Sequence, residues 1–315
     1  MKNILEANHT FNTDFYILAF GKSGVTDFVL FSIFLLLYLI CLTWNSVIIA
    51  LINSDTHLQT PMFFFLSNLS LVDISYTSVT VPKLLDIFLT GNNRISSKDC
   101  FSQFFFFTGM ACTEIFLLTA MSYDRYVAIC KSLHYPLLMK KRNCNFIVAG
   151  SWASAYSTSL FVTTVASNIP FCGLKVIDQL YCDIKPMLKI SCGNTLPFQV
   201  VVYFETFLMG ICPFVSITLS YIKIISTILA VHRKGKRKKA FSTCTSHLTV
   251  IAIFYGTIFF VYMVPTSADF RNVNQIFSAL FLVVIPTLNP LIYSLRNNDI
   301  KCALRKKCNM LFKSY

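Results

Sequence analysis

Seven long apolar runs limit what this chain can fold into more than any other feature of its sequence. The hydrocarbon core of a bilayer is about 30 Å thick and needs roughly 20 mostly apolar residues per helix. Runs of that kind occupy residues 28–52, 61–85, 101–129, 146–169, 198–229, 241–262 and 275–295. A water-soluble domain of this length with 55% hydrophobic and 13% charged residues would expose large apolar patches. The sequence therefore predicts an all-α membrane protein, a bundle of seven transmembrane helices.

Basic residues indicate how the helices are oriented. If the N-terminus lies outside, the cytoplasmic side carries 18 of the 27 Lys and Arg residues. Cytoplasmic loops are enriched in these residues, so the N-terminus is expected outside and the C-terminus inside. This orientation divides the chain into an extracellular segment over 1–27, a seven-helix domain over 28–295 and a cytoplasmic tail over 296–315. No signal-peptide pattern precedes the first run, so Met1 is expected in the mature protein.

Two smaller features agree with that orientation. Asn8 begins an Asn-His-Thr glycosylation acceptor on the side expected to be outside. The net charge of +13 arises mostly from basic runs beside the inner ends of the helices, where anionic lipid or a cytoplasmic partner is expected rather than nucleic acid.

Four of the twelve cysteines fall on the predicted outer side: Cys100, Cys172, Cys182 and Cys192. An even number of cysteines in an oxidising compartment predicts two disulfides. Four cysteines permit three pairings, and the spacing alone does not choose among them.

Three carboxyl groups lie inside the apolar runs: Asp73, Glu114 and Glu205. Ionisable residues in the membrane are costly and mark functional sites. Asp73 and Glu114 lie at similar depth, so a polar centre is expected that contains Asn45, Asp73, Glu114 and Asn289. Such a centre binds water or a sodium ion, the one cofactor considered for this chain. The simpler alternative is hydrogen bonding between packed helices, with one carboxyl protonated.

Helical spacing indicates that the third apolar run contributes to three parts of the protein. At about 100° per residue, one stripe carries Phe107, Ala111, Glu114, Leu118 and Arg125. Its outer part is expected to line a cavity, its middle to hold a carboxyl group and its inner end to present an arginine.

Other classes of membrane protein fit less well. The runs show no matched pair of broken helices, which would indicate a transporter. The last run has no lysine for a retinal Schiff base. An enzyme is the least expected class, because the sequence shows neither a nucleophile paired with a base nor a metal-binding cluster. Cys244 and His247 share a helix face, but two candidate ligands do not make a metal site. A channel or transporter is the alternative from another class.

Five strings closely resemble vertebrate odorant receptors, a branch of the rhodopsin-like G protein-coupled receptors. They are PMFFFLSNLSLVDIS at 61–75, MSYDRYVAICKSLHYPLLM at 121–139, SYIKI at 220–224, KAFSTCTSHLTVIAIFYGT at 239–257 and PTLNPLIYSLRN at 286–297. The likeness runs over nearly the whole chain, and the third-helix and sixth-helix strings are specific to odorant receptors. It implies disulfides joining Cys100 to Cys182 and Cys172 to Cys192. Trp44 departs from the pattern, because this position is usually glycine.

The resemblance implies a pocket for small, mostly apolar odorants in the outer half of the bundle. Eleven residues are expected to line it: Phe107, Thr108, Ala111, Cys112, Glu205, Thr206, Met209, Tyr255, Ile258, Phe259 and Tyr262. Phe107 stands where receptors for amine neurotransmitters have an acid, so such a ligand is not expected. Two roles stay open for Glu205: pairing with a basic or hydrogen-bonding odorant, or facing a water-filled vestibule.

The resemblance also implies coupling to the stimulatory G protein of olfactory neurons, and so to cyclic AMP. The switch residues are then Asp124, Arg125, Tyr126, Tyr221, Asn289, Pro290 and Tyr293. Residues 233–239 contain no acid to restrain Arg125. After the last run, 301–307 reads as an amphipathic eighth helix, with Cys302 and Cys308 as candidate palmitoylation sites. The expected location is the plasma membrane of olfactory cilia, and the closest alternative is a receptor for an internal metabolite elsewhere.

Overall fold

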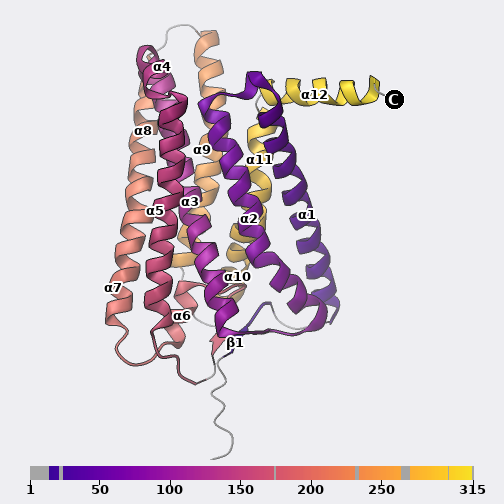
Figure 1. Ribbon diagram of the computed structural model, residues 1–315, viewed down its shortest axis with the longest axis vertical. Coiled ribbons are helices and arrows are strands. Elements are labelled where there is room, and N and C mark those ends of the chain that lie inside the picture. Colours follow the sequence, from indigo (N-terminus) through magenta and orange to yellow (C-terminus); the bar gives the residue numbers. More distant parts are fainter. Residues whose placement is uncertain are drawn as a thin grey trace, which may run out of the picture.

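The protein is a bundle of long helices that run side by side (Figure 1). The computed structural model describes residues 14–20, 24–173, 175–230, 234–263, 270–296 and 298–313. The longest uninterrupted helices are α1 (Gly24–Ser54), α2 (Pro61–Thr90), α3 (Ser97–Cys130), α5 (Lys141–Ser167) and α9 (Lys234–Met263). Each contains most of one predicted apolar run.

The described helices support a membrane bundle. Five of them are long and apolar enough to cross a bilayer: Val25–Ser54, Pro61–Thr90, Ser97–Cys130, Leu196–Leu229 and Arg271–Ile292. A shorter apolar stretch, His247–Tyr262, lies within α9. α5 packs along α3 although its composition does not meet the same criterion. The count of seven spans therefore stays a prediction.

Two of the predicted spans contain a turn of π-helix. The fifth consists of α7 (Leu196–Glu205), the π-turn η3 (Thr206–Ile211) and α8 (Cys212–Leu229). The seventh consists of α10 (Arg271–Ala279), the π-turn η5 (Leu280–Val284) and α11 (Ile285–Arg296). A proline follows each π-turn by two residues, at Pro213 and Pro286. Proline has no N–H and its ring clashes with the carbonyl four residues earlier, so the helix widens locally instead of continuing.

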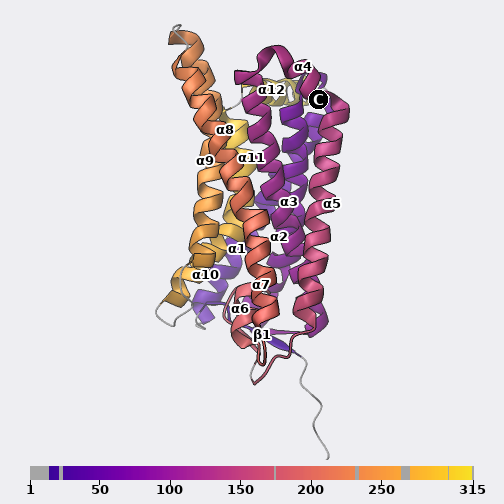
Figure 2. The same cartoon turned by 90° about the vertical axis from the view of Figure 1, so that its left-hand side faces the viewer.

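α3 occupies the middle of the bundle. It packs against α2, α5, α8 and α9, whereas α1 packs on α2 and α11 at the periphery (Figure 2). Its buried residues include Phe104, Phe107, Leu117 and Met121, which form part of one apolar core shared by the surrounding helices. Any group on α3 therefore lies close to several other helices.

The two ends of the bundle differ. One, the sheet end, carries a three-stranded sheet in which β1 (Phe15–Ile17) lies between β2 (Arg94–Ile95, antiparallel) and β3 (Val176–Ile177, parallel). The short helix α6 (Ile184–Ile190) is at the same end. At the opposite end, the α12 end, α12 (Asn298–Lys313) runs across the bundle axis (Figure 1). The short elements η1 (Thr56–Leu58), η2 (Ser132–His134) and α4 (Tyr135–Leu138) lie there too.

Candidate functional site

A cavity of about 780 Å³ lies between α3, α8 and α9 and reaches the π-turns η3 and η5. Its lining includes all eleven residues that the sequence analysis assigned to a pocket: Phe107, Thr108, Ala111, Cys112, Glu205, Thr206, Met209, Tyr255, Ile258, Phe259 and Tyr262. Apolar side chains such as Ile115, Phe214 and Phe281 make up most of the remaining wall. The geometry brings the predicted residues together around one cavity.

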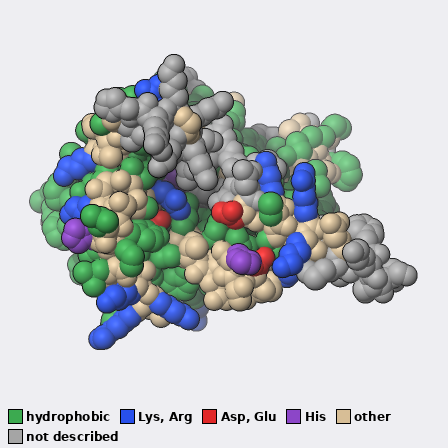
Figure 3. Space-filling model, turned by 90° about the horizontal axis from the view of Figure 1, so that it is seen from above, with side chains coloured by type: hydrophobic (Ala, Val, Ile, Leu, Met, Phe, Trp, Pro, Cys, Tyr) green, Lys and Arg blue, Asp and Glu red, His purple; other side chains and the backbone are tan. Residues whose placement is uncertain are grey.

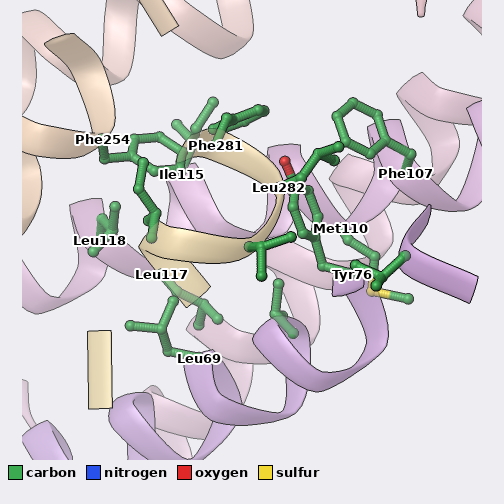
Figure 4. Close-up of a cluster of buried hydrophobic side chains, with 14 of the residues drawn as sticks. Leu69, Tyr76, Phe107, Met110, Ile115, Leu117, Leu118, Phe254, Phe281 and Leu282 are labelled. Atoms are coloured by element: carbon green, nitrogen blue, oxygen red, sulfur yellow. The ribbon is translucent and has the colours of Figure 1, made fainter. Parts of the chain in front are cut away.

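The ring of Phe107 is fixed by aromatic neighbours from three other parts of the chain. Its centroid lies 4.9 Å from that of Tyr76 on α2, 4.3 Å from Tyr181 in the loop after α5, and 6.1 Å from Phe281 on η5. Figure 4 shows Phe107, Tyr76 and Phe281 within this cluster. Phe107 is 1% exposed. Because its neighbours hold it on several sides, it sets the shape of the cavity wall.

The loop between α5 and α7 covers the cavity at the sheet end. Disulfides join Cys100 to Cys182 and Cys172 to Cys192, which is the pairing that the resemblance implied. The backbone N–H of Cys182 also donates to Gln103 Oε1 on α3 over 2.9 Å. These bonds fix the loop on α3, next to the pocket residues.

Asp183 follows directly after the anchored cysteine and lines the cavity, a role that the sequence analysis missed. Its Oδ1 accepts hydrogen bonds from the N–H of Ile184 at 2.8 Å and from the hydroxyl of Tyr262 at 3.1 Å. The side chain is 2% exposed. Burial raises the pKa of this carboxyl to about 6, although the hydrogen bonds and nearby Lys185 oppose the shift. Its place directly after Cys182 was the available signal in the sequence, because a disulfide to α3 brings the next residue to the sheet end of the bundle.

Glu205 is the second carboxyl group of the cavity wall. It ends α7 directly before the π-turn, and the thiol of Cys112 on α3 lies 3.9 Å from its Oε1. The hydroxyl of Tyr255, on the α9 side, is buried without a hydrogen-bond partner among the described residues. The cavity is thus mostly apolar but carries a few polar groups that face inward.

The polar centre forms around Asn289. Its Nδ2 donates to Asp73 Oδ1 and Oδ2 at 3.2 and 3.3 Å and to Glu114 Oε1 at 3.1 Å. Asn45 is not bonded to this group. Its Nδ2 instead donates to the carbonyl oxygens of Pro286 at 3.1 Å and Cys41 at 3.0 Å. Three of the four predicted residues therefore meet directly, and Asn45 supports the adjacent backbone of α11.

Two of the predicted switch residues, Asp124 and Arg125, lie near the α12 end of α3. Arg125 Nη2 is 3.4 Å from Asp124 Oδ2, and the hydroxyl of Tyr135 donates to Asp124 Oδ1 over 2.9 Å. Tyr221 on α8 is hydrogen-bonded to Nδ1 of His247 on α9. Neither Tyr135 nor His247 was predicted in this role, since Tyr135 comes after a turn and has no helical spacing to Asp124.

The remaining predicted residues lie away from these contacts or outside the described residues. Tyr126 is half-buried beside Lys131 and Lys223, and Pro290 is inside α11. Cys302 is exposed on α12. Asn8 and the side chains of Tyr293 and Cys308 lie outside the described residues. Figure 3 looks onto the α12 end and shows Lys and Arg side chains spread over this face.

Comparison with known proteins gives matches over nearly the whole chain. The sequence model of the family described as olfactory receptor matches residues 34–311. Olfactory receptor 7C1 of Homo sapiens is 44% identical over 297 residues, which cover 94% of this chain and 93% of that protein. Olfactory receptor 10C1 of Homo sapiens and olfactory receptor-like protein OLF1 of Canis lupus familiaris are each 42% identical over 302 residues, covering 96% of this chain and 97% of each relative.

Proposed function

Because the chain belongs to the olfactory receptor family, we propose that it binds small, mostly apolar odorants in the cavity between α3, α8 and α9 and activates a G protein. Members of this family are receptors and not enzymes. The proposed G protein is the stimulatory olfactory type, whose activation raises cyclic AMP.

The observation that carries this proposal is the layout of α3. This one helix holds Phe107 at the cavity, Glu114 at the polar centre and Arg125 near the α12 end. A ligand that prefers one of two bundle conformations shifts the equilibrium in proportion to its differential affinity. Since α3 contacts α2, α5, α8 and α9, a change at its cavity side is transmitted to helices that reach the α12 end.

At the α12 end, Arg125 is the group proposed to meet the G protein. Its guanidinium is always charged, and its ion pair with Asp124 holds it at rest. The Tyr221–His247 contact joins α8 to α9 beside it, so a separation of these helices would break that contact. The basic face at this end suits contact with both the G protein and anionic lipid.

The proposed orientation places the sheet end outside the cell and the α12 end inside. Two disulfides at the sheet end suit an oxidising compartment, and the basic α12 end suits the cytoplasm. In this arrangement 1–27 is extracellular, 28–295 forms seven spans, and α12 is an eighth helix on the inner leaflet. Glycosylation of Asn8, palmitoylation of Cys302 or Cys308 and residence in olfactory cilia belong to the same proposal.

The polar centre is a candidate sodium site. Sodium, like other hard cations, prefers oxygen ligands, and Asp73 and Glu114 present carboxylate oxygens to the same amide of Asn289. Such an ion would neutralise charge that the buried carboxyls otherwise carry together. Its proposed role is to favour the resting bundle.

A panel screen with a cyclic AMP reporter tests the proposed function. Cells that carry the receptor at the surface should respond to at least one small odorant in a saturable manner. The matched control is Arg125→Ala, which leaves the cavity intact and should abolish that response at equal surface level. A response that persists in the control, or no response to any odorant, contradicts the proposal.

A further inference from the structure

The odorant cavity combines an apolar wall with two inward-facing carboxyl groups and has no basic residue in its described lining. Asp183 comes from the loop and Glu205 from α7, so neither lies on the helix that carries the acid in receptors for amine neurotransmitters. A cavity of this composition is unusual for a purely apolar ligand.

Asp183 has unused hydrogen-bonding capacity inside the cavity wall. Its Oδ1 is occupied by Ile184 and Tyr262, whereas Oδ2 is buried and makes no hydrogen bond of normal geometry in the described part of the chain, although the hydroxyl of Tyr181 lies close to the carboxyl group. A buried charged group without a partner costs free energy, which a bound cation or donor recovers. The loop therefore holds an acceptor in place before any ligand arrives.

Lys185 is the basic residue nearest to Asp183 along the chain, but it is not part of the described lining of the cavity. Its Nζ donates to the carbonyl of Val261 over 2.9 Å, and the residue lines a separate small pocket with Asp178 and Arg271. Glu205 has only the Cys112 thiol as a polar contact among the described residues, and a thiol is a weak donor. Both carboxyl groups are thus left to interact with a ligand.

From these contacts we propose that the receptor is selective for small apolar molecules that carry one protonated amine, held by Asp183 and Glu205. This inference rests on the odorant-receptor function proposed above. The aromatic rings of Phe107, Tyr255 and Tyr262 suit the ammonium group as well, because their faces attract cations. Carboxylic acids are excluded, since their anions would meet two acids and no basic side chain in the described lining of the cavity.

The test compares compounds that differ only in their polar group. Hexylamine, decylamine and benzylamine are each measured beside the alcohol and the carboxylic acid of the same skeleton, at constant pH and known surface level. We expect the amines to activate at lower concentration than the alcohols and the acids to be inactive. Glu205→Gln and Asp183→Asn should each raise the half-maximal amine concentration about tenfold or more while that for alcohols changes by less than about twofold.

Asp178→Asn is the matched control, because Asp178 is in the same loop but pairs with Arg271 at 2.9 Å outside the cavity. It should leave the ratio of amine to alcohol potency unchanged. If alcohols or acids activate better than amines, or if neither cavity variant changes that ratio, the amine inference is wrong and the receptor function stands. A receptor silent to these compounds and to a broad odorant panel overturns both.

Discussion

The side chain of Asn45 supplies a hydrogen-bond donor that the backbone of α11 lacks because of its prolines. The carbonyl of Pro286 would normally accept from the N–H four residues later, but that residue is Pro290, which has none. The Nδ2 of Asn45 supplies the donor at 3.1 Å. The sequence indicates that Asn45 belongs to the polar centre, but its hydrogen-bond partner depends on how α1 packs on α11.

Replacing Asn45 with leucine should destabilise the receptor without changing which ligands it recognises. A buried carbonyl left unpaired costs about 1–3 kcal/mol. The purified receptor should therefore melt at a lower temperature, while the rank order of agonists stays the same. Ser46→Ala is the control, because Ser46 is the exposed neighbour on α1. Equal melting temperatures for the two variants would refute the proposed role of Asn45.

Asp183 predicts a pH dependence at the residue scale. Burial raises its pKa to about 6, so the carboxyl is mostly charged at neutral pH and becomes neutral as the pH falls through that value. The titratable groups around it are Tyr76, Tyr181, Tyr262, Lys185 and Glu205. Alkylamines stay protonated over this pH range. A lower pH therefore weakens the attraction only by neutralising the carboxyl group of the receptor.

Lowering the outer pH from about 7.5 to about 5.5 should therefore weaken amine responses several-fold and leave alcohol responses nearly constant. Asp183→Asn should reduce that pH effect by the part that Asp183 contributes. Dose series for one amine and its alcohol at both pH values provide the measurement. An amine response that is equally pH-sensitive in wild type and variant would exclude Asp183 as the titrating group.

At the scale of elements, the sequence predicted the long helices better than their irregularities. Apolar runs locate a helix because the bilayer demands a minimum length. The same runs hide the π-turns η3 and η5, since hydrophobic residues continue through both. Pro213 and Pro286 were the available signals. The sheet formed by β1, β2 and β3 depends on pairing between distant short segments, which no local pattern specifies.

The contact between α3 and α5 can be tested with a pair of glycines. A Cβ added at Gly109 would lie 3.1 Å from the ring of Tyr156, which is held by stacking on Trp152. At Gly150 nothing lies within 4 Å. Gly109→Ala should lower the melting temperature, because overpacking costs about 1–3 kcal/mol.

Gly150→Ala should leave the melting temperature unchanged or raise it, since alanine favours a helix over glycine by about 1 kcal/mol. The two variants make the same chemical change in helices that touch each other. If Gly109→Ala is as stable as Gly150→Ala, α3 and α5 are not packed as closely as described.

The loop over the cavity depends on its covalent anchor. Cys182→Ser breaks the disulfide to Cys100 and frees the segment that holds Tyr181 and Asp183 in place. Surface delivery should fall strongly, as loss of a native disulfide typically costs 2–5 kcal/mol. Surface staining measures the effect, with Cys212→Ser, at an exposed free cysteine of α8 outside the cavity lining, as the control. Normal staining of the Cys182 variant would contradict the anchoring role.

For the whole molecule, the family resemblance and the spacing on single helices predicted the lining of the cavity better than the loop that covers it. All eleven proposed pocket residues line one cavity because helical spacing fixes which side chains share a face. Asp183 was missed because the path of a loop follows from tertiary contacts and a disulfide. Tyr135 and His247 were missed for a related reason, since their partners belong to other elements.

The central claim is that one helix, α3, serves recognition at Phe107 and coupling at Arg125. The measurement that tests it most directly is a cyclic AMP dose series for several agonists, normalised to receptor counted at the cell surface. Phe107→Ala or Tyr255→Ala should change the rank order of agonists while some ligand still gives a full response. Arg125→Ala should lower the response to every agonist alike and keep their order. Pocket variants that weaken all agonists in parallel, or an arginine variant that reorders them, would contradict the account.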